Sequence, residues 1–298
     1  MAPNVRPARE SDLIRADDLV VHAINDLTER HGFGRFASPS SPTFQAFLLR
    51  DDPEGLWICE DDEGLVGFAF AWVRDDLWVL AQLFVSPGYQ GRGVGKELFA
   101  RTLAHADANG CASRALITFS FNRVSQALYM RHGLFPTAPI YFFTAESAHV
   151  RARPVNSLHG VRFDAHVDLR KLAEIDRLAI GVTREKHHTY LLADENTCGF
   201  GLFVDGDMAG YAYVSKTGHV GPVGIIDDKL LGDAFETALG FAAEVGAPQV
   251  SAFLPSTARP AMVRALEHRM RITVPMVVMA NNDFGHWTRY LPRNPGFM

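Results

Sequence analysis

Short apolar runs separated by polar turns predict two similar β-hairpins, one in each half of the chain. In the first half, the apolar run 56–59 is followed by an acidic turn at 60–64 and a second apolar run at 65–70. In the second half, the runs 201–204 and 208–213 flank a polar turn. Apolar runs of this length, bounded by turn residues, are typical of strands. Both hairpins contain the pattern Gly, aromatic, Ala, aromatic, which favours a repeat over chance.

Other predicted elements recur in the same order and extend this repeat. A short strand precedes a helix start, and a strand beginning with proline lies near the end of each half; the paired segments are 5–8 with Asp12, 161–163 with Asp168, and 139–142 with 275–278. The stretch 146–160 has weak periodicity and contains Arg, Pro, Asn and Gly, as linkers do. We therefore expect two copies of one α+β domain at 1–147 and 160–298, joined by a linker at 148–159.

Composition is that of a folded protein without an extended basic surface. The 298 residues suit two domains, and 47% hydrophobic with 21% charged residues is typical of globular chains. A net charge of -5 disfavours nucleic acid and anionic lipid as partners. No apolar stretch approaches the ~18 residues of a membrane span, and no signal-peptide pattern opens the chain, so we expect a cytoplasmic protein. We expect it to be a monomer or a homodimer. Three widely spaced cysteines, Cys59, Cys111 and Cys198, suggest neither a disulfide framework nor a zinc site.

A glycine-rich segment between a predicted strand and a predicted helix carries the candidate chemistry. The strand-like run 77–85 ends at Ser86-Pro87-Gly88, and apolar residues recur at helical spacing from Val94 until Asn109-Gly110. A helix start has unpaired N–H groups and the positive end of the helix dipole, so it attracts phosphate. The segment offers close backbone approach and two cations; its residues are Gln90, Gly91, Arg92, Gly93, Val94, Gly95 and Lys96.

This segment resembles the acyl-CoA pyrophosphate loop of the GNAT superfamily of N-acyltransferases. The family pattern is Gln or Arg, two residues, Gly, one residue, then Gly or Ala, and Gln90, Gly93 and Gly95 fill those positions. A Walker A loop is excluded because the Gly-Lys-Ser/Thr ending is missing, and the GxGxxG spacing of dinucleotide-binding units is absent. A second motif, in which Asn122 begins a segment and Tyr129 lies seven residues on, is similar to a later helix of the family.

The resemblance covers roughly the first 145 residues and implies a fold, a cosubstrate and a mechanism. Two tandem GNAT-like domains are expected, each with a mixed, mostly antiparallel sheet flanked by helices. Acetyl-CoA is the expected acyl donor, no metal is expected, and the pantetheine arm inserts beside a splayed central strand. That insertion implicates the backbone of Leu83, Phe84 and Val85, while Asn122 is a further cofactor contact as well as a helix N-cap. Tyr129 is the candidate acid for the thiolate leaving group.

The general base and the acceptor pocket stay open at this point. Many relatives place Glu on the strand before the loop, but the corresponding residue here is Gln82, which cannot act as a base. Alternatives are a water chain to a carboxylate or histidine, or the Met298 carboxylate on a tail, 287–298, that folds back; the side chains weighed are Asp75, Asp76, Glu29 and His31. The acceptor pocket of the family involves the loop 28–42, whose Gly, Ser and Pro content indicates mobility.

The second copy lacks these features and is expected to be degenerate. Asp227 and Asp228 lie where the first copy has its glycine-rich loop, and they would repel a diphosphate. Glu267 falls where the first copy has Tyr129. The adjacent His187 and His188 diverge on a helix or strand, so metal binding is disfavoured.

We expect an N-acetyltransferase that moves an acetyl group from acetyl-CoA to a primary amine in a ternary complex. A small-molecule amine is favoured over a protein or peptide amine. The alternative from another class is a catalytically silent acyl-CoA-binding sensor, which the missing strand Glu and the degenerate second copy motivate.

Overall fold

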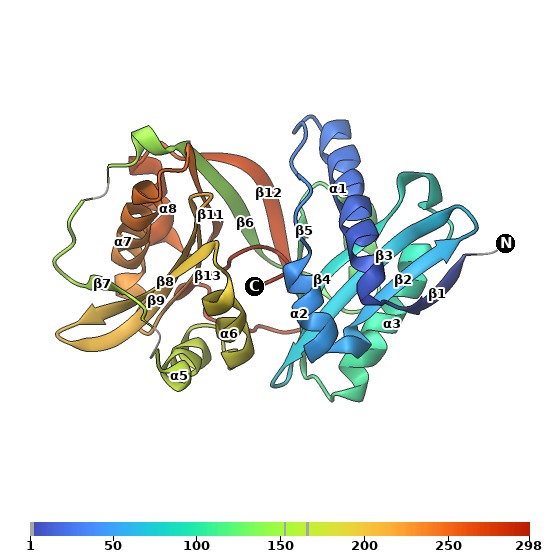
Figure 1. Ribbon diagram of the computed structural model, residues 1–298, viewed down its shortest axis with the longest axis horizontal. Helices are drawn as coiled ribbons and strands as arrows, with labels where there is room; N and C mark the ends of the chain where they lie inside the picture. The colour runs from blue at the N-terminus through green and yellow to red at the C-terminus, as the bar shows by residue number, and fades with distance from the viewer. Residues whose placement is uncertain (1–2, 152, 165–166) are drawn as a thin grey trace. The chain divides into compact units, whose positions relative to one another are not determined.

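The protein, in a computed structural model that describes residues 3–151, 153–164 and 167–298, divides into two compact units (Figure 1). Unit 1 comprises the chain up to Phe135 together with Met279–Asn282, and unit 2 comprises Pro136–Val278 and Asp283–Met298. Residue 152 of the predicted linker, and residues 1–2 and 165–166 of the predicted domains, lie outside the described part of the chain.

Unit 1 is a mixed sheet with helices on both faces. Its elements in chain order are β1 (Asn4–Pro7), α1 (Leu13–Arg30), α2 (Thr43–Asp51), β2 (Leu56–Asp61), β3 (Gly64–Arg74), β4 (Leu77–Val85), α3 (Val94–Ala108), β5 (Ser113–Phe119) and α4 (Arg123–Met130). The strands lie in the order β1-β2-β3-β4-β5, antiparallel as far as β4, whereas β4 and β5 are parallel.

Alternating residues of β3 face different helices. Ala69 packs in one apolar cluster with Val94 and Leu98 of α3, whereas the next residue, Phe70, contacts Phe44 of α2. Successive strand residues point to opposite faces of a sheet. The α3 face and the α1/α2 face of unit 1 are therefore opposite, as Figure 1 shows with α1 in front of the sheet and α3 behind it.

Unit 2 repeats this order of elements, as the sequence predicts. It contains β6 (Phe135–Glu146), β7 (His159–Arg162), α5 (Leu169–Ala179), α6 (Glu185–Ala193), β8 (Thr197–Val204), β9 (Asp207–Ser215), β10 (His219–Ile225), α7 (Leu231–Glu244), β11 (Gln249–Pro255), α8 (Arg259–Glu267), β12 (Arg271–Ala280) and β13 (Tyr290–Leu291). Its strands lie in the order β12-β6-β11-β10-β9-β8-β7, with β13 beside β10. The run from β7 to α8 matches the run from β1 to α4, which makes β10 the counterpart of β4.

The last strands of the two copies cross into each other's packing units. β6 follows the first copy in sequence but pairs with β11 in unit 2, from Ile140 opposite Pro255 to Glu146 opposite Gln249. In return, the end of β12 belongs to unit 1, where the Asn281 N–H donates to the Arg114 carbonyl at 3.1 Å. The packing units thus differ from the predicted bounds 1–147, 148–159 and 160–298, which stay a prediction about the repeated sequence.

None of the helices in the described ranges has the length and hydrophobicity needed to cross a bilayer.

Candidate functional site

β4 loses its partner strand halfway along its length. It pairs with β5 from Leu77 opposite Ser113 to Leu80 opposite Leu116, and the recorded register stops there. On its other side, β4 stays paired with β3 up to Val85, after a bulge that leaves Ala81 unmatched. Bulges bend a strand and increase its twist, which moves its end away from a neighbour. Within the described residues, the β5-facing edge of 82–85 is therefore open, as the family resemblance predicts.

The side chains of 82–85 point to the two faces of the sheet, so the edge itself is formed by the backbone. Leu83 and Val85 pack against the apolar cluster beneath α3, with Ala69 and Val94. Phe84 lies opposite Phe68 and so points to the other face, together with Gln82. A ligand that enters beside β4 would meet main-chain N–H and C=O groups, which suits a chain that carries amide groups of its own.

The glycine-rich segment turns directly from the open edge into the start of α3. Gly91 and Gly93 have φ of 77° and 88°, a region that disfavours side chains with a Cβ. No heavy atom lies within 4 Å of the place where a Cβ would stand on either glycine. The first helical bond runs from the Glu97 N–H to the Gly93 carbonyl at 3.1 Å, so the amides of the first turn point outward without a helical acceptor.

The polar side chains of the segment hold its shape and supply positive charge. The Gln90 Nε2 donates to the Val85 carbonyl at 3.2 Å, which ties the loop to the end of β4. The Arg92 guanidinium lies 5.0 Å from the centre of the Tyr89 ring, and Lys96 is exposed on the first turn of α3. An open nest of amides with two cations at a helix start is suited to a diphosphate.

Asn122 and Tyr129 take the helical positions that the second motif predicts. Asn122 is the N-cap of α4, where its side chain accepts the Ser125 N–H at 3.2 Å. Tyr129 is 4% exposed, and its ring lies 5.4 Å from that of Phe99 in α3. Burial raises the pKa of Tyr129 above its ordinary value, partly offset by a hydrogen bond with Ser125. The hydroxyl is therefore protonated at neutral pH, the state that a proton donor needs.

The structure separates the candidate bases. Asp75 and Asp76 form the turn before β4, so roughly 20 Å of strand, at about 3.3 Å per residue, separates Asp76 from Gln82. Glu29 is exposed and lies 3.9 Å from Arg35. His31 is nearer to the end of β5, with its ring 4.9 Å from that of Phe121.

The loop between α1 and α2 is held by hydrogen bonds along its length. The Asn25 Oδ1 accepts the N–H groups of Phe36 and Ala37 at 2.8 and 2.9 Å, and the Thr28 hydroxyl donates to the Gly34 carbonyl at 2.6 Å. Phe33 stacks on Phe121 at 4.5 Å. The composition of the loop predicts mobility, which stays a prediction; these bonds join the loop to α1, and the Phe33 ring lies beside the segment that follows β5. The sequence signal for them is a polar residue, Asn25, within the apolar stripe of α1, and the structure buries it.

In unit 2, the place that is open in unit 1 is filled by the chain itself. β10 pairs with β11 at His219 opposite Ser251 and Val220 opposite Ala252, and the register ends there. Beyond that point β13 runs antiparallel to β10, with Leu291 opposite Val223. The Ile225 N–H donates to the Arg289 carbonyl at 3.0 Å. A strand from the tail thus occupies the position beside β10 that corresponds to the open edge of β4.

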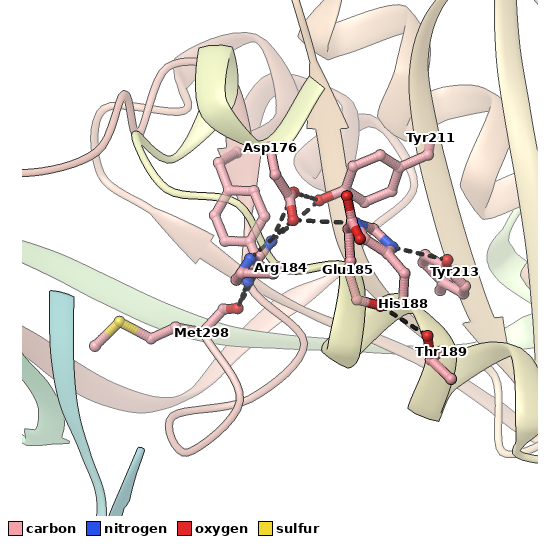
Figure 2. A network of polar contacts seen from close by, with 9 residues as sticks. Asp176, Arg184, Glu185, His188, Thr189, Tyr211, Tyr213 and Met298 are labelled. Carbon is pink, nitrogen blue, oxygen red and sulfur yellow. Dashed lines mark hydrogen bonds and ion pairs between the residues drawn. The ribbon is translucent and has the colours of Figure 1, made fainter. Parts of the chain in front are cut away.

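A buried ionic network fixes this tail (Figure 2). Arg184 forms two hydrogen bonds with Asp176, at 2.8 and 3.0 Å, and also donates to the Met298 main-chain oxygen and to the Tyr290 hydroxyl. Burial alone would raise the pKa of Asp176, but the charges of Arg184 and His188 hold it well below its usual range. The Met298 oxygen is bound here in unit 2, which corrects the idea that it serves as the base.

His188 and a trio in unit 1 are the groups closest to a metal-ligand pattern. Both ring nitrogens of His188 have partners, the Tyr213 hydroxyl at 2.9 Å and Asp176 at 3.0 Å. Among the described residues, Asp52, Glu54 and His105 have ligand atoms within 4.8 Å of one another. Asp52 is already engaged by the Val73 N–H at 2.7 Å and by His105 at 2.7 Å, and Glu54 is exposed. Asp52, His105 and His188 are thus engaged by other residues of the fold.

Comparison with known proteins agrees with this geometry. The model of the acetyltransferase (GNAT) family matches residues 21–134, which include β4, the glycine-rich segment and Tyr129. The chain is 33% identical to mycothiol acetyltransferase of Streptomyces avermitilis over 84 residues, 28% of this chain and 27% of that protein. It is 29% identical to aminoglycoside N(6')-acetyltransferase type 1 of Salmonella typhimurium over 105 residues, 32% of this chain and 72% of that protein. The match therefore spans about a quarter of the mycothiol enzyme.

Solved structures resemble the chain over both units. A protein of Pyrococcus horikoshii described as a candidate acetyltransferase has a TM-score of 0.79 at 17% identity, with 99% of this chain and 96% of that chain covered. A tandem GNAT protein from the clavulanic acid biosynthesis pathway has a TM-score of 0.63 at 16% identity, with 93% and 98% covered. At these identities the likeness concerns the fold. Residues 21–134 therefore form a domain that matches the acetyltransferase (GNAT) family, and a second copy of the same fold follows it along the chain.

Proposed function

We propose that the protein transfers an acetyl group from acetyl-CoA to a primary amine, at one working site in unit 1. The observation that carries this proposal is the open edge of β4 at 82–85, followed directly by an amide-lined helix start at Gly93. The edge would hold the amide-containing arm of the donor, and the helix start its diphosphate. The match of residues 21–134 to the family model and two relatives named as acetyltransferases support the reaction type.

The residues present divide the work between binding and proton transfer. The backbone of Leu83, Phe84 and Val85 would align the donor, and the segment from Gln90 to Lys96 would neutralise its phosphates. The amine nitrogen would attack the thioester carbonyl carbon, forming a C–N bond as the C–S bond breaks. Tyr129 would donate its proton to the leaving sulfur. The nitrogen would release one proton to solvent, and Tyr129 would recover one proton from solvent. The net products are an amide and a thiol.

A small-molecule amine is the favoured acceptor. The names of both relatives refer to small molecules, mycothiol and aminoglycosides. A protein or peptide amine is the second choice.

The test is equilibrium binding of acetyl-CoA followed by thiol release across a library of amines. Binding together with thiol release that depends on an amine supports the transferase. Binding without turnover for any amine would favour the alternative, a silent acyl-CoA sensor, for which Gln82 in place of a carboxylate is the specific observation. Failure to bind any acyl-CoA would contradict both functions.

A further inference from the structure

We propose that Gln82 orients the attacking amine. Its side-chain carbonyl would accept a hydrogen bond from one N–H group of the amine, without taking the proton. This inference rests on the proposed function and names a positioning residue for it. The Gln82 Oε1 is buried and has no hydrogen-bond partner within the described part of the chain.

An unpaired buried carbonyl is destabilising, so each such group calls for an explanation, and a catalytic role or a bound water is among those known. The side chain as a whole is only half-buried, and rotation about its last bond has a broad, shallow profile. The carbonyl can therefore turn toward a hydrogen-bond donor on a ligand that reaches the open edge. A ligand N–H group would supply the hydrogen bond that the protein itself does not.

The position of Gln82 in the sheet places it where, under the proposed function, the amine substrate would approach. It is the first residue after the bulge at Ala81, where β4 parts from β5. It lies opposite Phe70, whose ring contacts Phe44 of α2, so both side chains are on the α1/α2 face. The anchored loop between α1 and α2 lies on that face. Leu83 and Val85 face α3 instead, so the alternation of the strand separates the acceptor side from the packed side.

The chemistry of an amide limits what this residue can do. Its carbonyl accepts a hydrogen bond from an N–H group but cannot hold a proton at any ordinary pH. Gln82 would thus align a neutral amine, and the proton of an ammonium substrate must leave before attack. The acid limb of kcat/KM against pH should then follow the pKa of the substrate amine and should shift when amines of different pKa are compared.

Three variants separate orientation from folding and from cofactor binding. Gln82→Met keeps the length of the side chain but removes the hydrogen-bond acceptor. Gln82→Glu keeps a hydrogen-bond acceptor, and this one can also take a proton. Gln249→Met, at an exposed position of β11 in unit 2, is the matched control. The readouts are the Kd of acetyl-CoA, the melting temperature, and kcat/KM against pH with the best amine of the library.

For Gln82→Met we expect kcat/KM to fall about tenfold, the value of one hydrogen bond of about 1.4 kcal/mol, with an unchanged Kd for acetyl-CoA. For Gln82→Glu we expect activity to persist and the acid limb to move below the pKa of the amine. Wild-type kcat/KM and an unshifted acid limb in both variants would overturn the role of Gln82 while leaving the transferase intact. A wild-type protein that binds acetyl-CoA but turns over no amine would instead overturn the transferase, and this role with it.

Discussion

At the scale of single residues, the partners of a buried group decide which chemistry it can perform. Tyr129 is enclosed by Phe99 and its neighbours, which keeps its hydroxyl protonated. Met298, considered as a base, is 1% exposed and bound by Arg184. Residue type and spacing could nominate both residues. Only the fold could separate them, because burial depends on segments far away in the sequence.

Replacing Tyr129 by Phe should lower turnover and leave donor binding unchanged. The ring and its contact with Phe99 remain, while the proton donor is lost, so kcat should fall about 10²–10⁴-fold. Steady-state kinetics together with equilibrium binding of acetyl-CoA measures both effects. If kcat stays at the wild-type value across the pH range, Tyr129 is not the acid.

His219 should make the stability of unit 2 depend on pH. Its Nε2 donates to the Arg293 carbonyl at 2.5 Å, and its Nδ1 accepts from the Ser251 hydroxyl at 2.8 Å, which is an arrangement for a neutral ring. Burial, with the Arg293 charge, lowers the pKa of His219 to about 4 from an ordinary 6.5. The unfolded chain therefore binds the proton first, and stability is lost as pH falls from 6.5 toward 4.

The loss should reach at most about 3.5 kcal/mol, at about 1.4 kcal/mol per pKa unit. Denaturant unfolding at several pH values measures it. The His219→Gln variant, which cannot titrate, should show a flatter dependence through this window. Parallel curves for the two proteins would show that His219 contributes nothing to it.

At the scale of elements, the sequence predicted the parts of the site better than their surroundings. The strand at 77–85, the helix from Val94 and the cap at Asn122 all appear at the predicted places, because local periodicity and Gly or Pro punctuation specify them. The bulge at Ala81 was not predicted, since one extra residue in a strand leaves no mark on an apolar run. The hydrogen bonds from Phe36 and Ala37 to the Asn25 side chain were not predicted, because these residues lie 11 and 12 positions away in an irregular loop.

Gly93 and Gly110 offer a matched pair at the two ends of α3. Both have positive φ, 88° and 63°, and neither has a heavy atom near the place of a Cβ. Replacing either by Val should cost stability through backbone strain, about 1–2 kcal/mol. Only Gly93→Val should also weaken acetyl-CoA binding, by at least about tenfold, because the new side chain would stand where the diphosphate approaches. Calorimetry of both variants tests this, and equal Kd values would place the diphosphate elsewhere.

At the scale of the whole molecule, the repeat was visible in the sequence but the use of its last strands was not. The prediction of two similar α+β domains is confirmed. Pairing of β6 with β11 joins residues about a hundred positions apart. β13 has two residues, too few for a periodic pattern. Long-range pairing is set by the register and shape of the whole sheet, which a single apolar run does not encode.

The protein should bind one acyl-CoA per chain. Unit 1 has an open strand edge, while in unit 2 the tail lies beside β10, and Asp227 caps the turn before α7 by accepting the Lys229 N–H at 3.0 Å. Isothermal titration calorimetry with acetyl-CoA should give a stoichiometry of one. A value of two would mean that the tail leaves β10 and that the second copy retains a site.

The strand β13 makes unit 2 comparable to a receptor with its ligand covalently attached. A tethered ligand competes at a high effective concentration that does not change with the surroundings. A dissolved donor, in contrast, stabilises unit 1 only in proportion to RT ln(1 + [L]/Kd). Under the proposed function, the two copies of one fold would respond differently to metabolite supply: the stability of unit 1 would rise and fall with the concentration of the donor, whereas the edge of β10 in unit 2 is already occupied by β13.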